Sequence, residues 1–301
     1  MKIGYVGVGN MGGALAARLA TAHQVIVQDR SAEAVERMRS LGATAGTLTQ
    51  IGEECQVVFV CLPTSAHVRQ VLFGPEGLAR SLTPGTLIID QTTGDPNETR
   101  KMAAELSAHG VDLIDAPVSG GVGGARAGTI AIMVGAKQGQ FDRALPFLQT
   151  ISPNIFHAGG IGNGHVIKLV NNLMSTAQRL LSFEGVMLAA KNGVDPRIAT
   201  EVLVAAGARN AYLDKMMGPR VLNGKLNVGF TLGLAHKDVR LACQMGMDSG
   251  VPMFFGNLAR ELYQLAINEK GAQSQVDTVG QVYDKLAGTQ VIPLHTDLPP
   301  A

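Results

Sequence analysis

A glycine pattern near the start of the chain constrains its fold more than any other feature. Gly7-Val8-Gly9-Asn10-Met11-Gly12 follows the apolar run Lys2–Gly7, which we expect to be a strand, and opens a helix from about Met11. A second apolar strand, Gln24–Gln28, ends at Asp29. Short apolar strands joined by a helix are typical of a parallel sheet. The chain therefore begins as an α/β domain.

The alternation of strands and helices continues to about residue 160. Further strands are expected at Val57–Leu62, Thr86–Asp90, Val111–Ala116 and Ile130–Val134, and helices at Ala32–Leu41 and Asn97–Ala108. Nearly continuous apolar strands indicate a sheet that helices cover on both faces. We predict a Rossmann domain over residues 1–162, with a doubly wound, mostly parallel sheet.

The pattern changes after about residue 160, where no convincing strand follows. A helical stretch runs from Gly164 to Lys191 and ends at Asn192-Gly193. Later helices are expected near Pro196–Ala206, Ala211–Gly218, Lys237–Ser249, Pro252–Asn268 and Thr278–Leu286. We predict an all-α domain over residues 163–290, entered through an interdomain helix at 163–192, and a loose tail over 291–301.

Charge and composition exclude several classes of function. The formal net charge of +1, without long charged runs, argues against nucleic acid or a membrane as partner. No apolar run could span a bilayer, and the strand at residue 2 leaves no room for a signal peptide. The three cysteines lack metal-ligand spacing, and the seven histidines form no ligand cluster. We therefore predict a cytoplasmic protein with reduced thiols and no bound metal.

The glycine pattern also predicts a ligand. In dinucleotide-binding domains the first glycine allows a tight turn, the second lets the pyrophosphate approach the backbone, and the third lets helix and strand pack closely. The helix N-terminus then faces the phosphates. Gly7, Gly9, Asn10, Met11 and Gly12 are therefore candidates for cofactor binding. A glycine turn that merely joins strand to helix is the alternative.

The ends of three strands extend this candidate cofactor site. Asp29 could accept hydrogen bonds from the ribose hydroxyls, which favours NAD, and its carboxylate would repel the 2′-phosphate of NADP. Arg30 could pair with that phosphate or remain a solvated charge, so NADP stays possible. Leu62, Pro63 and Thr93 follow two other strands, where ligands of such sheets bind, and are candidates for the cofactor wall or plain loop residues.

A glycine-rich segment in the middle of the chain suits a small anion. In Asp115–Gly124, the hydroxyl of Ser119 stands beside the bare backbone amides of Gly120 and Gly121, which could hold a carboxylate. The segment contains no cation, so strong selection for phosphate or sulfonate is not indicated. A flexible interdomain loop is the alternative.

The long helix carries a lysine among apolar residues. Lys168 lies within Gly162–Asn172, and Asn171 and Asn172 follow on the same helix face. A buried lysine is costly unless it has a task, and a hydride-transfer enzyme needs a proton donor and acceptor beside its cofactor. Lys237, which we expect at the start of a later helix, could reach the nicotinamide or form a surface ion pair.

Four motifs, in this order, resemble the β-hydroxyacid dehydrogenases, a family that includes 3-hydroxyisobutyrate dehydrogenase and tartronate semialdehyde (2-hydroxy-3-oxopropionate) reductase. They are Gly7-x-Gly9-x-Met11-Gly12, Asp115-Ala116-Pro117-Val118-Ser119-Gly120-Gly121, Gly162-x-Gly164-x-x-x-Lys168-x-x-Asn171-Asn172 and Lys237-Asp238. The resemblance extends from Lys2 to about Leu286. One departure is Ala17-Arg18, where the family often has Asn-Leu, and it concerns helix packing rather than chemistry.

The resemblance implies a role for each substrate-site residue. Lys168 is the general acid/base by this resemblance. Ser119, Gly120 and Gly121 hold the substrate carboxylate, and Asn172 orients the substrate.

The resemblance also implies a reaction, in which Thr93 and Lys237 line the nicotinamide end of the cofactor. The chain would be an NAD-dependent oxidoreductase, a homodimer or homotetramer, that interconverts a small 3-hydroxy acid and its semialdehyde. An imine reductase shares this architecture, but those enzymes usually replace the lysine that is present here as Lys168. A noncatalytic nucleotide-binding protein would be expected to lack the lysine or the substrate loop.

Overall fold

The chain divides into two compact units. A computed structural model describes residues 1–293, with a first unit of Met1–Lys168 and a second that begins at Leu169. The division falls inside the long helix α8, Asn163–Lys191. The predicted domain boundary at residue 162 stays a prediction, and most of the predicted tail lies outside the described residues.

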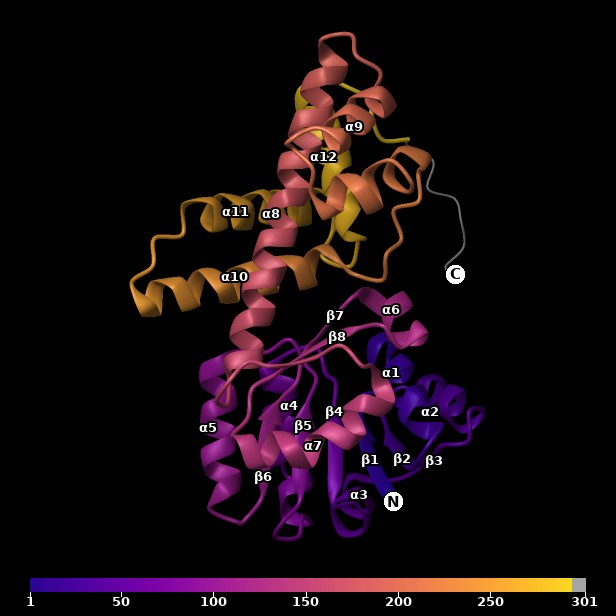
Figure 1. Cartoon of the computed structure of the whole chain (residues 1–301), viewed down its shortest axis with the longest axis vertical. Coiled ribbons are helices and arrows are strands. Elements are labelled where there is room, and N and C mark those ends of the chain that lie inside the picture. The colour runs from indigo at the N-terminus through magenta and orange to yellow at the C-terminus, as the bar shows by residue number, and fades with distance from the viewer. Residues whose placement is uncertain (294–301) are drawn as a thin grey trace. The chain divides into compact units, whose positions relative to one another are not determined.

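A six-stranded parallel sheet organises the first unit (Figure 1). Its strands are β1 (Lys2–Val6), β2 (Gln24–Gln28), β3 (Thr44–Ala45), β4 (Val57–Val60), β5 (Leu87–Asp90) and β6 (Asp112–Asp115). They pair in the order β3-β2-β1-β4-β5-β6. The chain reverses its direction of travel across the sheet between β1 and β4, and ligands of such sheets bind at the carboxyl ends of the strands near that point. The predicted Rossmann fold is confirmed.

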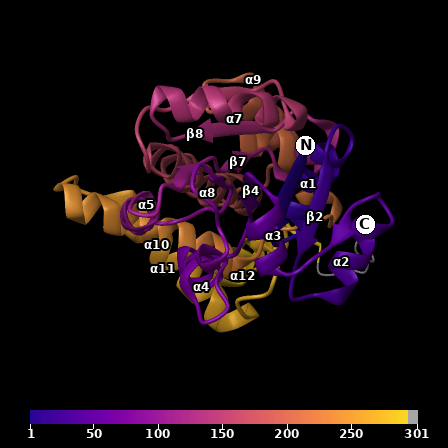
Figure 2. The same cartoon turned by 90° about the horizontal axis from the view of Figure 1, so that it is seen from below.

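Helices cover both faces of this sheet, since alternate strand residues point to opposite sides. On one face, Tyr5 and Phe59 belong to a core shared with α1 (Asn10–Ala20), α2 (Ala32–Arg39) and α7 (Gln138–Ile151). On the other, Val58 and Val60 belong to a core with α3 (Leu48–Glu54), α4 (Ser65–Phe73) and α5 (Pro96–Ser107). A 3₁₀ turn follows at Leu78–Arg80. Figure 2 shows α7 and α4 on opposite sides of β4.

A second, three-stranded sheet completes the first unit. Its strands are β7 (Val118–Ser119), β8 (Ala131–Val134) and β9 (Ile155–His157), with β7 antiparallel and β9 parallel to β8. Only β8 was predicted. The short helix α6, Gly121–Ala127, occupies the segment for which a flexible loop was the alternative.

The described part of the second unit is helical, as predicted. Its elements are α9 (Pro196–Ala205), a π-helical turn (Leu213–Met217), 3₁₀ turns at Val221–Asn223 and Val276–Thr278, α10 (Leu232–Ser249), α11 (Phe254–Lys270) and α12 (Val279–Ala287). α10 and α11 lie side by side (Figure 1). The expectation that Lys237 begins a helix is wrong. α10 starts at Leu232 because the Thr231 side chain caps it by accepting from the Leu234 N–H.

Candidate active site

The glycine loop leaves the start of α1 open. Gly7 has a φ of +90°, and a Cβ there would collide with the Cys61 carbonyl oxygen. At Gly12 a Cβ would collide with the Gly7 carbonyl oxygen, whereas at Gly9 it would meet nothing within 4 Å. Gly9 is the N-cap and provides no side-chain hydrogen bond. The loop therefore packs tightly on its inner side and presents bare backbone on its outer side, as a pyrophosphate requires.

Asp29 braces this loop from the end of β2. Its Oδ2 accepts from the Val8 N–H at 2.7 Å, and its Oδ1 accepts from the Ser31 N–H at 2.8 Å. A carboxylate has about four lone-pair sites, so capacity remains for ribose hydroxyls. Arg30, next in the chain, is exposed.

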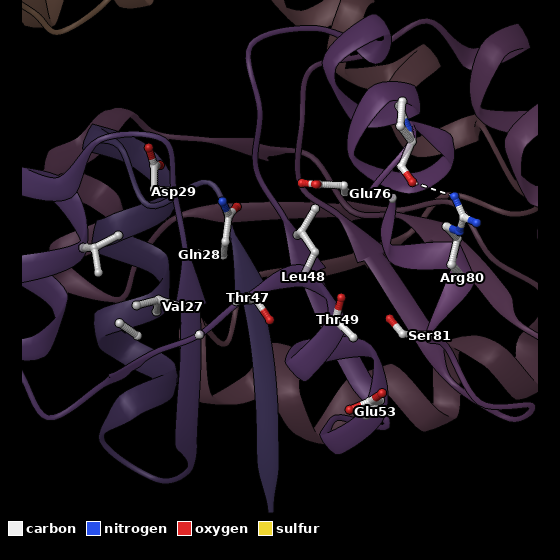
Figure 3. Close-up of a pocket in the computed structure, with 15 residues that line it drawn as sticks. Val27, Gln28, Asp29, Thr47, Leu48, Thr49, Glu53, Glu76, Arg80 and Ser81 are labelled. Atoms are coloured by element: carbon white, nitrogen blue, oxygen red, sulfur yellow. Dashed lines mark hydrogen bonds between the residues drawn. The ribbon is translucent and has the colours of Figure 1, made fainter.

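A cavity of about 770 Å³ opens beside Asp29, with Glu53 near its other end (Figure 3). Its lining includes the carboxylates of Asp29, Glu53 and Glu76 and the guanidinium of Arg80, which donates to the Pro75 carbonyl at 2.6 Å. Three carboxylates against one cation make this cavity unfavourable for a phosphate. Asp29 is the one predicted site residue among its described lining.

The ends of β4 and β5 are tied together at Thr92. The Leu62 N–H donates to Thr92 Oγ1 at 3.0 Å, and the Thr92 N–H donates to Asp90 Oδ1 at 2.9 Å. Thr92 is 1% exposed, whereas Thr93 is half-buried and Pro63 is exposed. The predicted wall residues Leu62, Pro63 and Thr93 are thus brought to one edge of the sheet.

The predicted substrate segment has a backbone that suits glycine alone. Ser119 ends β7 and is half-buried. Gly120 and Gly121 have φ values of +141° and +68°, which side-chain-bearing residues rarely adopt. A Cβ at Gly121 would meet nothing within 4 Å, so open space adjoins its α-carbon.

Asp115, at the end of β6, anchors the first turn of α8. Its Oδ1 accepts from the Gly162 N–H at 2.6 Å and its Oδ2 from the His165 N–H at 2.7 Å. A Cβ at Gly164 would collide with the Met133 carbonyl oxygen and lie 2.8 Å from Asp115 Oδ2. Burial raises the pKa of Asp115 to about 6, although the two backbone N–H bonds lower it. The carboxylate is therefore largely ionised at neutral pH, where it complements the positive end of the helix.

Lys168 lies one turn into this anchored helix and is only 8% exposed. The sequence indicated this setting from the apolar neighbours of the lysine. The anchor itself was missed, because Asp115 was quoted as part of the substrate segment without a role. His165, whose ring is buried beside the same carboxylate, was missed as well.

In the second unit, Asp238 gathers two predicted site residues. Asn172 Nδ2 donates to Asp238 Oδ2 at 2.6 Å, and Lys237 Nζ lies 3.1 Å from Asp238 Oδ1. Asp238 is 1% exposed and the Lys237 side chain 13%. Lys237 is therefore paired with a carboxylate, but not on the surface, and the Asn172 amide is held in one orientation.

Other chemistries find little support among residues 1–293. No group of three or more His, Cys, Asp or Glu there could hold a metal ion. No helix there is long and apolar enough to cross a membrane. Burial raises the pKa of the Cys55 thiol to about 11 and that of Cys61 to about 12, which disfavours the nucleophilic thiolate form.

Comparisons with known proteins match both halves of the chain. Residues 2–160 match the NAD binding domain of 6-phosphogluconate dehydrogenase, and residues 162–283 match the family described as NAD-binding of NADP-dependent 3-hydroxyisobutyrate dehydrogenase. The 3-hydroxyisobutyrate dehydrogenase of Pseudomonas aeruginosa is 38% identical, over 87% of this chain and 91% of its own. The 2-hydroxy-3-oxopropionate reductase of Escherichia coli is 31% identical, over 95% and 98%.

The fold comparison points the same way. A structure of Mycobacterium tuberculosis 3-hydroxyisobutyrate dehydrogenase with L-serine has a TM-score of 0.85 and 29% identity, and the match covers 94% of this chain and 98% of that one. The chain belongs to the β-hydroxyacid dehydrogenase family. It is an NAD(P)-dependent hydroxyacid dehydrogenase.

Proposed function

We propose that this enzyme interconverts a small 3-hydroxy carboxylate and its semialdehyde, with Lys168 as the general acid/base. The observation that carries the proposal is the burial of Lys168, at 8% exposure, in the first turns of a helix that Asp115 anchors. A mostly buried ammonium is stabilised poorly, and a neighbouring cation destabilises it further. Beside a positive nicotinamide ring, Lys168 would therefore release its proton more readily and act as a base.

The substrate carboxylate would be held by the Ser119 hydroxyl and the Gly120 and Gly121 amides. Asn172, one turn after Lys168 on α8, would orient the hydroxyl-bearing carbon, and Asp238 fixes its amide. During oxidation Lys168 Nζ takes the hydroxyl proton, and in the reverse direction it returns the proton to the carbonyl oxygen. The bound cofactor supplies the hydride acceptor or donor. Such proton transfer accelerates the reaction by about 10²–10⁴.

NAD is the cofactor we propose, in preference to NADP. Asp29, which braces the glycine loop, is the residue predicted to bind the ribose, and the adjoining cavity carries more carboxylates than cations. A 2′-phosphate would meet repulsion there. Arg30 is the residue that could offset it. The cytoplasmic location and the homodimer or homotetramer remain predictions.

A substrate panel tests the proposed activity. Purified enzyme would be mixed with 3-hydroxyisobutyrate, glycerate or L-serine, with NAD and with NADP, while reduced cofactor absorbance is followed. We expect turnover of at least one acid and a higher kcat/KM with NAD. Failure of every acid and of the matching semialdehydes with both cofactors would contradict the proposal.

Two lysines of the same helix provide the matched test of mechanism. Lys168→Ala should lower kcat by about 10²–10⁴ and leave cofactor affinity nearly unchanged. Lys191, at the far end of α8, is exposed and donates to the Gly288 carbonyl at 3.1 Å, so Lys191→Ala should retain native kcat. Equal kcat values for the two variants would remove Lys168 from the chemistry.

A further inference from the structure

His165 lies one helical turn before Lys168, and its buried ring joins α8 to the end of β5. The ring is 0% exposed. Its Nε2 lies 2.8 Å from the Thr92 carbonyl oxygen and its Nδ1 lies 3.0 Å from Thr99 Oγ1. A carbonyl oxygen can only accept a hydrogen bond, so Nε2 carries a proton and donates it to Thr92.

Thr92 is the residue that connects the predicted cofactor wall. Its hydroxyl accepts from the Leu62 N–H at the end of β4, and the next residue is Thr93, which we place at the nicotinamide end. Thr92 therefore already links the ends of β4 and β5, and the His165 ring links α8 to the same residue. All of these residues belong to the first unit.

The surroundings of the ring leave it little freedom. A Cβ at Gly94 would lie 3.1 Å from His165 Cε1 and 3.4 Å from Nδ1. The backbone N–H of His165 meanwhile donates to Asp115 Oδ2. One residue is thus fixed through its main chain to β6 and through its side chain to β5.

We propose that His165 is a positioning residue for Lys168, which fixes the first turn of α8 to the Thr92–Thr93 segment. Residues three apart on a helix share a face, so the two side chains are placed by the same turn. This inference rests on the proposed acid/base role of Lys168. His165 does not touch the reacting atoms, and it acts by holding the lysine in register with the nicotinamide side.

Loss of the hydrogen bond between His165 and the Thr92 carbonyl should change the position of the first turn of α8. Leucine at position 165 would fill similar space but leave the buried Thr92 carbonyl without its donor. The helix turn could then shift to let that carbonyl find another partner. A misplacement of about 1 Å can reduce a catalytic rate by about 100-fold. Glutamine would still offer an N–H donor toward Thr92.

The experiment compares His165→Leu with His165→Gln, using 3-hydroxyisobutyrate or whichever panel acid gives the highest kcat/KM. Fluorescence titration with NADH counts the competent sites, so kcat is expressed per site. We expect His165→Leu to lower kcat by about 10–100-fold, with substrate KM and NADH affinity within about threefold of native. His165→Gln should retain at least about a third of native kcat.

A matched control separates positioning from loss of stability. Leu148 is fully buried in the same unit. It belongs to α7, which covers the face of the sheet opposite to α5, so Leu148→Ala should lower the melting temperature without lowering kcat per site. Native kcat in His165→Leu would overturn the proposal. So would a loss confined to KM, or a glutamine variant as slow as the leucine variant.

Two additions keep the test decisive. If His165→Leu does not fold, a tenfold fall of kcat in folded His165→Gln would itself overturn the proposal. Thr99→Val removes one partner of Nδ1, together with the bond from the Thr99 hydroxyl to the Asp95 carbonyl, and leaves the Nε2 contact in place, so kcat should stay within about threefold of native.

Lys168→Ala is measured alongside to separate the positioning role from the proposed function. If Lys168→Ala stays active, the proposed function is wrong. If Lys168→Ala is inactive but His165→Leu has native kcat, only the positioning role of His165 is wrong.

Discussion

The helices α1 and α8 both start at a Gly-x-Gly sequence, but the two starts use it in opposite ways. α1 starts after Gly7-x-Gly9, and a Cβ at Gly9 would meet nothing within 4 Å. α8 starts after Gly162 and contains Gly164, where a Cβ would collide with the Met133 carbonyl oxygen. In both places the absence of a side chain lets another group come close to the backbone. At Gly9 that side is open, whereas at Gly164 it is filled by other residues of the protein.

The difference lies in the source of the negative charge. A helix N-terminus stabilises an anion because its first N–H groups are unpaired and its dipole is positive there. At α1 we propose that the anion is a phosphate of the cofactor. At α8 it is Asp115, which accepts from the Gly162 and His165 N–H groups. The start of α1 would therefore bind a ligand that comes and goes, whereas the start of α8 holds Lys168 in a fixed place.

Replacing Gly9 or Gly164 with valine should give the largest contrast between the two helix starts, in cofactor affinity and in stability. Gly9→Val should leave the melting temperature near native, since its space is open, but hinder the pyrophosphate. Loss of two charge-assisted hydrogen bonds, about 3 kcal/mol, corresponds to about 100-fold weaker NADH binding. Gly164→Val should instead destabilise the fold by about 1–3 kcal/mol or more through overpacking. Calorimetry and fluorescence titration measure both, and the reverse pattern would break the comparison.

The pKa of Asp115 predicts how stability varies with pH. Burial raises it from the ordinary 3.8 to about 6, so between these values the folded chain holds a proton that the unfolded chain releases. The Asp115 contribution to the free energy of unfolding should therefore fall as pH rises from 4 to 6, by about 2 of the roughly 3 kcal/mol that the full shift represents. Urea unfolding of native enzyme and Asp115→Asn at pH 4.5 and 7 measures it. Parallel pH dependences in the two proteins would contradict the inferred shift.

The substrate segment offers a smaller, more local test. Gly121 has a φ of +68°, so Gly121→Val would strain the backbone and displace the amides proposed to hold the carboxylate. We expect substrate KM to rise about tenfold, the loss of about one hydrogen bond to a charged group, with NADH affinity nearly native. Gly123 lies in α6 with open space around it and no positive φ. Gly123→Ala should therefore keep native KM, and a similar rise there would remove the segment from the site.

The smallest expected effect concerns cofactor choice. Asp29→Asn removes the charge but keeps an acceptor for the Val8 or Ser31 N–H. The ratio of NAD to NADP affinity should fall a few-fold, since one screened charge is worth about 1 kcal/mol. Glu33→Gln, an exposed carboxylate on α2, is the control. An unchanged ratio in Asp29→Asn would show that Asp29 does not discriminate the two cofactors.

The sequence predicted what depends on local pattern. The strands β1, β2, β4 and β5 are continuous apolar runs, and the glycine loop and Lys168 stand in recognisable local contexts. It also suggested an all-α second half. β3 and β7, with two residues each, are too short to carry a pattern. α7 was not predicted, and it contains Pro146, a residue that normally interrupts a helix.

What the sequence could not predict depends on contacts between distant segments. Asp115 reaches Gly162 and His165 across 47 and 50 residues, and no local rule pairs them. The start of α10 at Leu232 could have been predicted from the sequence, because Thr231 is a good N-cap residue. The helix was predicted to begin at Lys237, so the N-cap signal at Thr231 was missed.

Chemical rescue tests the role of Lys168 most directly. Lys168→Ala would be assayed for kcat with and without added ethylamine, which can enter the space left by the lysine side chain and carry the proton. We predict a fall of about 100-fold or more without the amine, and a recovery that grows with the concentration of neutral ethylamine while NADH affinity stays native. If Lys168→Ala kept more than about a tenth of native kcat without amine, Lys168 would not be the general acid/base.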